Sequence, residues 1–350
     1  MITKLGDVIT EYSVRNKNKE NIPVYSVTNE QGFCTGYFSK DVASKDRTTY
    51  KIVPKGYFAY NPSRINVGSV DWQDCEERVI VSPLYVVFGV NKNLDQQYLL
   101  HYLKSDIALT YIKAFATGSV RDNLKFSVLQ ELPINLRPID EQRKIASVLD
   151  HINRVIELRK KELSTLDALI KSRFIELFGD IREPSKWEKK TWSELVTIQN
   201  GRDYKNILVE SGGYPVYGTG GEMARASEYL CPENTIIVGR KGTINNPLLI
   251  KEKFWNVDTA FGVIVGNQLH YQYFYNFCRM FDFSTLNKQA VLPSTTKADL
   301  LKIEIAVPPM ELQNQFAAFV EQTDKSKLAV QQGLQELEIL KKSLMQQYFG

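Results

Sequence analysis

The chain has 350 residues, of which 43% are hydrophobic and 24% are charged, and its formal net charge is +4. This length allows two or three domains with buried cores, and the composition is that of an ordinary globular protein. The small net charge excludes the class of polycationic proteins that bind nucleic acid through non-specific electrostatic attraction alone. Any contact with DNA would need local basic patches, or a partner that supplies more phosphate contacts.

Residue usage also limits the compartment and the chemistry. No apolar run approaches the roughly 18 residues of a membrane span, and the N-terminal sequence MITKLGDVIT lacks the apolar core of a signal peptide. We therefore expect a cytoplasmic protein without a membrane partner. The four cysteines have no CxxC spacing, so we expect buried free thiols and no zinc site. They are Cys34, Cys75, Cys231 and Cys278.

Residues 1–137 form the first predicted domain. Short β-branched and aromatic runs alternate there with Gly, Pro and Asn, which predicts a twisted β-sheet with a few helices, and hence an α+β domain. In chain order we expect an opening apolar-polar segment, three strand-like runs and one helix, at 4–12, 22–26, 50–60, 78–90 and 94–115.

A long helix is predicted over 138–179, because apolar residues recur there every seven positions. About 38 helical residues would be roughly 57 Å long. Such an a/d-like seam is typical of a helix that packs on another helix. One series is Leu149, Ile156, Leu163, Ile170 and Leu177, and the other is Ile145, Ile152 and Leu166, interrupted where Arg159 and Arg173 lie.

Residues 180–308 form a second predicted domain of the same α+β class. Its Pro-Val-Tyr strand at 214–218 matches the one at 22–26 with an offset of 192 positions. The remaining runs predict an opening segment, two strands and a helix, at 191–199, 234–242, 261–266 and 269–281. The two domains therefore have related scaffolds, and their divergent loops predict different specificities.

A second long helix is predicted over 309–350, where the sequence repeats that of 138–179 without a gap at an offset of 171 positions. The seams are too narrow for either helix to be stable alone, so we expect an antiparallel pair. The alternative is that each helix packs on a separate domain. The duplication predicts two similar modules, and so a partner with two similar surfaces, of which duplex DNA is the first to consider.

The candidate DNA contacts follow predicted strands. In the sequence GRKGTIN at 239–245, two cations lie between glycines, where backbone and side chains can approach a phosphate together. Arginine and asparagine can also contact guanine and adenine edges. The candidates from both domains are Asn61, Ser63, Arg64, Asn66, Arg121, Tyr217, Thr219, Arg240, Lys241, Thr243 and Asn245. For any one of them, a solvated turn residue is an equal alternative.

Weaker candidates lie shortly before each long helix, where capping and turn roles compete with DNA binding. Besides Arg121, they are Ser119, Asn123, Ser294, Thr295 and Lys297.

Motifs for catalysis are missing. No GxxxxGK[ST] is present for ATP, and no glycine-rich loop has the spacing for S-adenosylmethionine or a dinucleotide. The run Asn61-Pro62-Ser63-Arg64 lacks the second proline and the aromatic residue of the amino-methyltransferase motif. We therefore expect a chain with no catalytic residue, no metal site and no cofactor of its own.

The chain resembles the DNA-specificity subunit of type I restriction–modification systems over essentially its whole length. In that family a Pro-x-x-Glu-Gln segment leads into each long helix, as in NLRPIDEQRKIASVLDHI at 135–152. The second copy, AVPPMELQNQFAAFVEQT at 306–323, has Leu312 in place of the glutamate and keeps the periodicity. The loop GRKGTI at 239–244 is also similar to one in the family.

The resemblance implies two target-recognition domains, 1–137 and 180–308, held apart by an antiparallel helix pair with pseudo-twofold symmetry. Each domain would read one half of a split double-stranded DNA site. The helices would set the spacing and bind two methyltransferase (M) subunits, with restriction (R) subunits as possible further partners. S-adenosylmethionine, ATP and Mg²⁺ would be bound by the partner subunits. The alternatives are a self-contained methyltransferase or nuclease, and a structural assembly protein.

Overall fold

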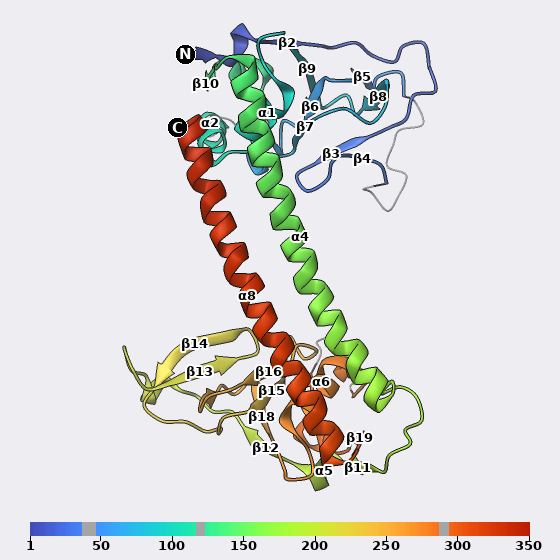
Figure 1. Ribbon diagram of the computed structural model, residues 1–350, viewed down its shortest axis with the longest axis vertical. Coiled ribbons are helices and arrows are strands. Elements are labelled where there is room, and N and C mark those ends of the chain that lie inside the picture. The colour runs from blue at the N-terminus through green and yellow to red at the C-terminus, as the bar shows by residue number, and fades with distance from the viewer. Residues whose placement is uncertain (37–46, 117–122, 287–293) are drawn as a thin grey trace. The chain divides into compact units, whose positions relative to one another are not determined.

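The computed structural model contains two compact units (Figure 1). Unit 1 comprises Met1–Arg159 and Gly333–Gly350, and unit 2 comprises Lys160–Gln332. The described residues are 1–36, 47–116, 123–286 and 294–350. No helix among them is both long and apolar enough to cross a membrane.

Unit 1 is built around a four-stranded antiparallel sheet in the order β2-β9-β6-β7. These strands are β2 Ile9–Glu11, β6 Phe58–Tyr60, β7 Val70–Trp72 and β9 Val86–Val90. Three smaller antiparallel pairs accompany the sheet: β1 Ile2–Lys4 with β10 Pro133–Asn135, β3 Ser26–Thr28 with β4 Gly32–Cys34, and β5 Lys51–Pro54 with β8 Arg78–Val81. The helices are α1 Gln96–Leu103, α2 Asp106–Ala116 and α3 Phe126–Leu129, with 3-10 turns η1 Leu5–Asp7 and η2 Ile65–Val67.

Unit 2 contains a four-stranded sheet with the corresponding order, β12-β18-β15-β16. Its strands are β12 Val196–Asn200, β15 Thr235–Gly239, β16 Leu248–Ile250 and β18 Ala260–Val265. Around it lie the pair β11 Lys189–Thr191 with β19 Glu304–Ala306, and the sheet of β13 Tyr214–Gly218, β14 Gly221–Ala226 and β17 Trp255–Asn256. The helices and 3-10 turns are α5 Trp192–Leu195, η3 Lys205–Ile207, α6 Tyr271–Met280, η4 Phe283–Leu286 and α7 Lys297–Leu300. The mixed α and β content predicted from the sequence is confirmed.

Three sequence-based expectations are corrected. The single helix expected over 94–115 is two helices, because Ser105 Oγ accepts from the amide of Ala108 and so starts α2. Each domain contains several small sheets instead of one. All four cysteines are free, but Cys75 is exposed and Cys34 is half-buried.

The long helices α4 Ile139–Phe178 and α8 Met310–Phe349 each contribute one part to each unit. The predicted seam of α4 is most deeply buried near the helix ends. In α4, Leu149 is 0% exposed and Ile170 is 2% exposed, whereas Leu163 between them is half-buried. The ends of α4 therefore belong to the domain cores and its middle keeps more solvent contact, whereas in α8 Val330 near the middle is only 7% exposed.

A buried glutamine fixes the start of α4 in unit 1. Gln142 is 0% exposed, and its Nε2 donates to the carbonyls of Asn93 at 2.8 Å and Arg137 at 2.7 Å. Its Oε1 accepts from the amide of Asp95 at 2.9 Å. Asp95 in turn caps α1 by accepting from the amide of Tyr98. One side chain thus joins the first turn of the long helix to the first turn of α1.

Unit 2 repeats this arrangement at Gln313, which is also 0% exposed. Its Nε2 donates to the carbonyls of Gln268 at 3.1 Å and Pro308 at 2.8 Å, and its Oε1 accepts from the amide of His270 at 2.7 Å. His270 is the N-cap of α6 and accepts from the amide of Gln272. The repeat therefore has glutamine at both equivalent positions because the side chain makes the same hydrogen bonds in both units.

Each long helix ends on a phenylalanine that packs against a tyrosine of the unit in which that helix ends. In unit 1, the ring centroid of Phe349 is 5.1 Å from that of Tyr98. In unit 2, the ring centroid of Phe178 is 4.7 Å from that of Tyr273. Both tyrosine hydroxyls donate to a strand carbonyl at 2.8 Å. Each helix therefore begins in one unit with its glutamine and ends in the other with its phenylalanine.

Replacing either glutamine with alanine leaves two carbonyls and one amide without a partner in a buried place. We expect Gln142→Ala and Gln313→Ala each to lower the free energy of unfolding by about 2–4 kcal/mol. Urea denaturation of the full chain measures the loss. The control is Gln332→Ala, which removes an exposed amide from α8 and is expected to change stability by less than about 0.5 kcal/mol. Losses as small as the control's would show that the bonds are dispensable.

Candidate nucleic-acid interface

The first candidate surface is the loop that follows β15 in unit 2. Its backbone is fixed, because the amide of Arg240 donates to the carbonyl of Thr259 at 2.9 Å and its carbonyl accepts from the amide of Thr295 at 3.0 Å. Lys241 forms a further backbone bridge with Ser294. The side chains of Arg240 and Lys241 are both exposed. The loop therefore presents two cations from a rigid backbone.

The two glycines around these cations are required by the geometry. A Cβ on Gly239 would lie 2.5 Å from the carbonyl oxygen of Thr243, so a side chain there collides with the loop's own backbone. Gly242 has φ of 77°, in the left-handed region that favours glycine. The Gly-Arg-Lys-Gly pattern noted in the sequence is thus a tight turn that brings its cations to the surface.

Unit 1 has the corresponding loop after β6. The carbonyl of Pro62 accepts from the amide of Leu124 at 3.0 Å, which matches the bond from Thr295 to Arg240 in unit 2. The hydroxyl of Ser63 donates to the Oδ1 of Asn123. The segment before α3 therefore binds the loop after β6 in unit 1, and the segment before α7 binds the loop after β15 in unit 2 in the same way.

The weaker candidates Asn123, Ser294 and Thr295 thus contact the stronger candidates Ser63, Lys241 and Arg240, respectively. Thr295 is 3% exposed and its hydroxyl donates to the carbonyl of Gly239 at 2.7 Å, so it supports the loop from below. Asn123 and Ser294 are separated by 171 positions, the same offset as between the two long helices. This offset is the feature of the sequence that indicates equivalent roles for the two residues. Arg121 lies outside the described residues.

The hairpin β13–β14 places Thr219 beside the unit 2 loop and Tyr217 against Phe254. The Cγ2 of Thr219 is 3.1 Å from the place of a Cβ on Gly239, so the hairpin tip touches the loop's first residue. Tyr217 is half-buried and packs edge-on against Phe254, with ring centroids 5.7 Å apart. Burial raises the pKa of the Tyr217 hydroxyl. Tyr217 thus supports the hairpin, whereas Thr219 faces the loop.

Asn245 has a structural task at the far end of the same loop. Its Nδ2 donates to the carboxylate of Asp282 at 2.8 Å, and its Oδ1 accepts from the amide of Phe283 at 2.7 Å. Both ends of the amide are therefore occupied, while the neighbouring Thr243 side chain is exposed.

The unit 1 candidates line two cavities that share Asn61. One of about 640 Å³ also contains Ser63 and Asn123, and the other of about 290 Å³ contains Arg64. Asn61 itself accepts from the amide of Ser63 at 3.1 Å, which shapes the turn. Asn66 is half-buried in the turn that follows Arg64.

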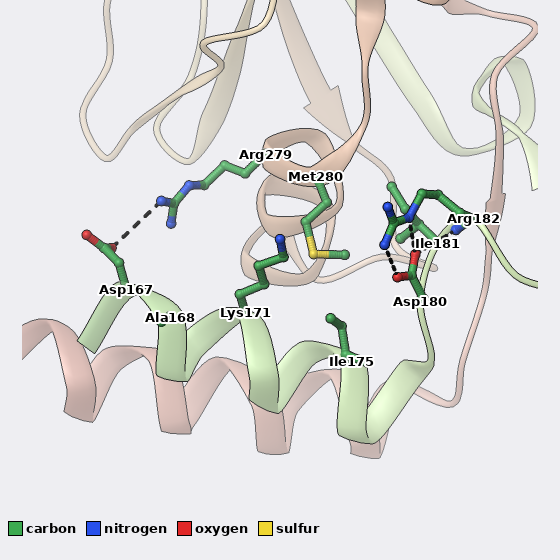
Figure 2. A pocket seen from close by; sticks show the side chains of 9 residues that line it. All are labelled: Asp167, Ala168, Lys171, Ile175, Asp180, Ile181, Arg182, Arg279 and Met280. Carbon is green, nitrogen blue, oxygen red and sulfur yellow. Dashed lines mark hydrogen bonds and ion pairs between the residues drawn. The ribbon is translucent and has the colours of Figure 1, made fainter. Parts of the chain in front are cut away.

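A further cavity of about 380 Å³ lies in unit 2 beside the end of α4 (Figure 2). Its acidic groups are already paired, since Asp167 lies 3.7 Å from Arg279 and Asp180 accepts from Arg182 at 2.9 Å. The Arg182 side chain lowers the pKa of the Asp180 carboxyl. These internal pairs offset most of the charge of the cavity, which the cations Lys171, Arg182 and Arg279 also line. Among the described residues, no group of three or more His, Cys, Asp or Glu is placed to hold a metal ion.

A family model described as the type I restriction modification DNA specificity domain matches residues 2–168 and 184–339. The chain is 26% identical over 137 residues to the specificity subunit of the type I restriction enzyme MjaIX of Methanocaldococcus jannaschii. That match covers 34% of this chain and only 32% of the relative. The putative MjaX specificity subunit of the same organism is 22% identical over 343 residues, covering 88% of this chain and 80% of the relative.

Solved structures show the same fold at low identity. The S subunit of a type I restriction–modification system from M. genitalium has a TM-score of 0.64 and 16% identity, covering 100% of this chain and 96% of that one. A chain from a structure of the assembly and conformational transition of a type I system has a TM-score of 0.61 and 17% identity, covering 99% and 97%.

The bonds of Asn245 predict a measurable electrostatic effect. Hydrogen bonds from Ser284 and Asn245 hold the pKa of Asp282 below its ordinary value, because they stabilise the ionised carboxylate. We expect Asn245→Ala to raise that pKa towards its usual range, as followed by an NMR titration of the carboxyl carbon. The control Asn246→Ala removes a neighbouring exposed amide and should leave the titration unchanged. An unaltered Asp282 pKa in Asn245→Ala would contradict the assigned bond.

Proposed function

The chain belongs to the family of type I restriction–modification DNA specificity domains, and we propose that each of its two domains reads one half of a bipartite DNA site. One observation carries this proposal. The same backbone bond, from Leu124 to Pro62 and from Thr295 to Arg240, holds a strand-end loop in both units. The scaffold of the loops is shared while their exposed side chains differ, as two readers of different half-sites require.

We further propose that the chain reads DNA without performing chemistry on it. Two methyltransferase (M) subunits would bind S-adenosylmethionine and methylate adenine, and restriction (R) subunits would use ATP and Mg²⁺ where they are present. The sequence supports this division, since it lacks the glycine-rich motifs for those cofactors. Methyl transfer by the isolated chain in a labelled methyl-donor assay would favour a self-contained methyltransferase instead.

In this proposal α4 and α8 form an antiparallel pair with internal twofold symmetry, which sets the gap between half-sites. Contacts within unit 2 support the direction, because Phe178 meets Phe316 near the start of α8 while Asp167 pairs with Lys327 further along it. The same helices would bind the M subunits. Leu169 and Leu340, at equivalent positions of the repeat, are 46% and 47% exposed, which fits two copies of one partner.

The general test is co-expression with the methyltransferase subunit of the same system, followed by genome-wide mapping of methylated adenines. A bipartite motif with an unread gap is the expected result. A complex that binds no DNA would instead favour the structural assembly protein.

Arg240 is expected to read a base in the half-site of the second domain. Its guanidinium lies 6.0 Å from the centroid of the Phe261 ring and 3.5 Å from the carbonyl oxygen of Asp258, so both groups border the side chain. Arg240→Ala should then relax one position of one half-site, at a cost of about 1–3 kcal/mol against the wild-type site. The matched variant Lys241→Ala, which removes an exposed ammonium, should weaken binding at all positions alike. Uniform weakening by Arg240→Ala would make it a phosphate contact.

The spacing role predicts the effect of shortening both helices together. Removing residues 158–164 and the equivalent 329–335 shortens each helix by roughly 10 Å. With a rise of about 3.4 Å per base pair, the gap should become about three base pairs shorter. Methylation mapping measures the gap and the bases that flank it. Altered half-site bases with an unchanged gap would contradict the proposal that the helix pair sets the spacing.

A further inference from the structure

Unit 1 contains a hairpin whose tip was not among the residues expected to contact DNA. Strands β3 and β4 pair in register from Ser26 with Cys34 to Thr28 with Gly32. The three residues between them, Asn29, Glu30 and Gln31, are exposed and polar. We refer to these three residues as the hairpin tip. It presents two amides and one carboxylate to solvent from a two-stranded ribbon.

The hairpin is held rigidly at its base. The amide of Gln31 donates to the Thr28 hydroxyl at 3.0 Å, which closes the turn. The amide of Phe33 donates to the carboxylate of Asp71 at 3.3 Å, which ties β4 to β7. A Cβ on Gly32 would lie 1.6 Å from the same carboxylate, so only glycine allows this approach. Such anchoring favours recognition, because little order has to be created on binding.

The tip adjoins the strand-end loop of the same unit. The Oδ1 of Asn29 is 2.5 Å from the place of a Cβ on Gly68, which ends the 3-10 turn after Arg64. The hairpin and Arg64 also line the same cavity of about 290 Å³. The exposed guanidinium of Arg64 and the polar tip therefore border one surface.

Unit 2 has the same relation between a hairpin and a loop. Val24 and Val216 each form a parallel bridge, to Ile80 and Trp255 respectively, so the strands that lead into the two hairpins correspond. In unit 2 the hairpin tip touches the loop through Thr219 and Gly239, as described above. In both domains a hairpin tip thus touches the strand-end loop, at the end of the loop through Gly68 in unit 1 and at its first residue through Gly239 in unit 2.

We propose that the hairpin tip of unit 1, together with Arg64, reads base edges in the major groove of the half-site bound by that unit. This inference rests on the proposed function. A two-stranded ribbon fits the major groove, where an amide makes paired hydrogen bonds to adenine, arginine to guanine, and glutamate accepts from cytosine. Glu30 favours contact of the tip with base edges over contact with the DNA backbone, because a carboxylate repels phosphates but accepts a hydrogen bond from the amine of cytosine.

The test uses the full chain in complex with its methyltransferase subunits. Asn29→Ala and Gln31→Ala should each make one or two positions of a single half-site degenerate and leave the other half-site and the gap unchanged. Binding to the wild-type site should fall roughly 5- to 150-fold, the range for loss of one paired base contact. Gln31→Glu keeps the shape of the side chain and should shift one position from adenine towards cytosine. The control is Asn18→Ala, an exposed amide of the same domain, which should keep the wild-type motif.

Two results would overturn the inference and leave the proposed function standing. One is an unchanged motif in all three hairpin variants while Arg240→Ala alters the other half-site. The second is uniformly weaker methylation with the wild-type motif, which would give the tip a structural or phosphate role. If the wild-type complex itself methylates no bipartite motif, the proposed function fails, and the inference fails with it.

Discussion

The two buried glutamines are the constraint on which the rest of the structure depends. A helix of 40 residues with a narrow apolar seam has little stability of its own, so its position is decided by the contacts at its ends. Gln142 and Gln313 satisfy three backbone groups each and join the start of a long helix to the N-cap of a domain helix. Removing the side chain would leave those groups buried without partners, which explains why the repeat keeps an amide there.

This anchoring separates the shared scaffold from the variable surface. The four-stranded sheets have corresponding strand orders, and the backbone bonds behind the strand-end loops are the same in both units. What differs is the exposed chemistry: two cations at 240–241 in unit 2, and asparagine, serine and arginine at 61–64 in unit 1. A fixed backbone with variable side chains lets two related domains recognise different DNA sequences.

The charge of the chain is consistent with recognition by local contacts. A net charge of +4 over 350 residues supplies little non-specific attraction for DNA. Its exposed arginines at the strand-end loops, Arg64 and Arg240, extend from turns whose glycines have a defined steric purpose. Specificity in this arrangement comes from where a few polar groups are held, and additional phosphate contacts fall to partner subunits in the proposed complex.

The sequence by itself determined the features that depend on neighbours along the chain. Heptad periodicity and the gapless repeat predicted both long helices, and the glycines around Arg240 marked a turn that the structure contains. Tertiary structure decided the features that join distant residues. It showed that both ends of the Asn245 amide hold Asp282 and Phe283, and that Asn29 meets Gly68. Such contacts are fixed by packing between segments far apart in sequence, which no local pattern of residues encodes.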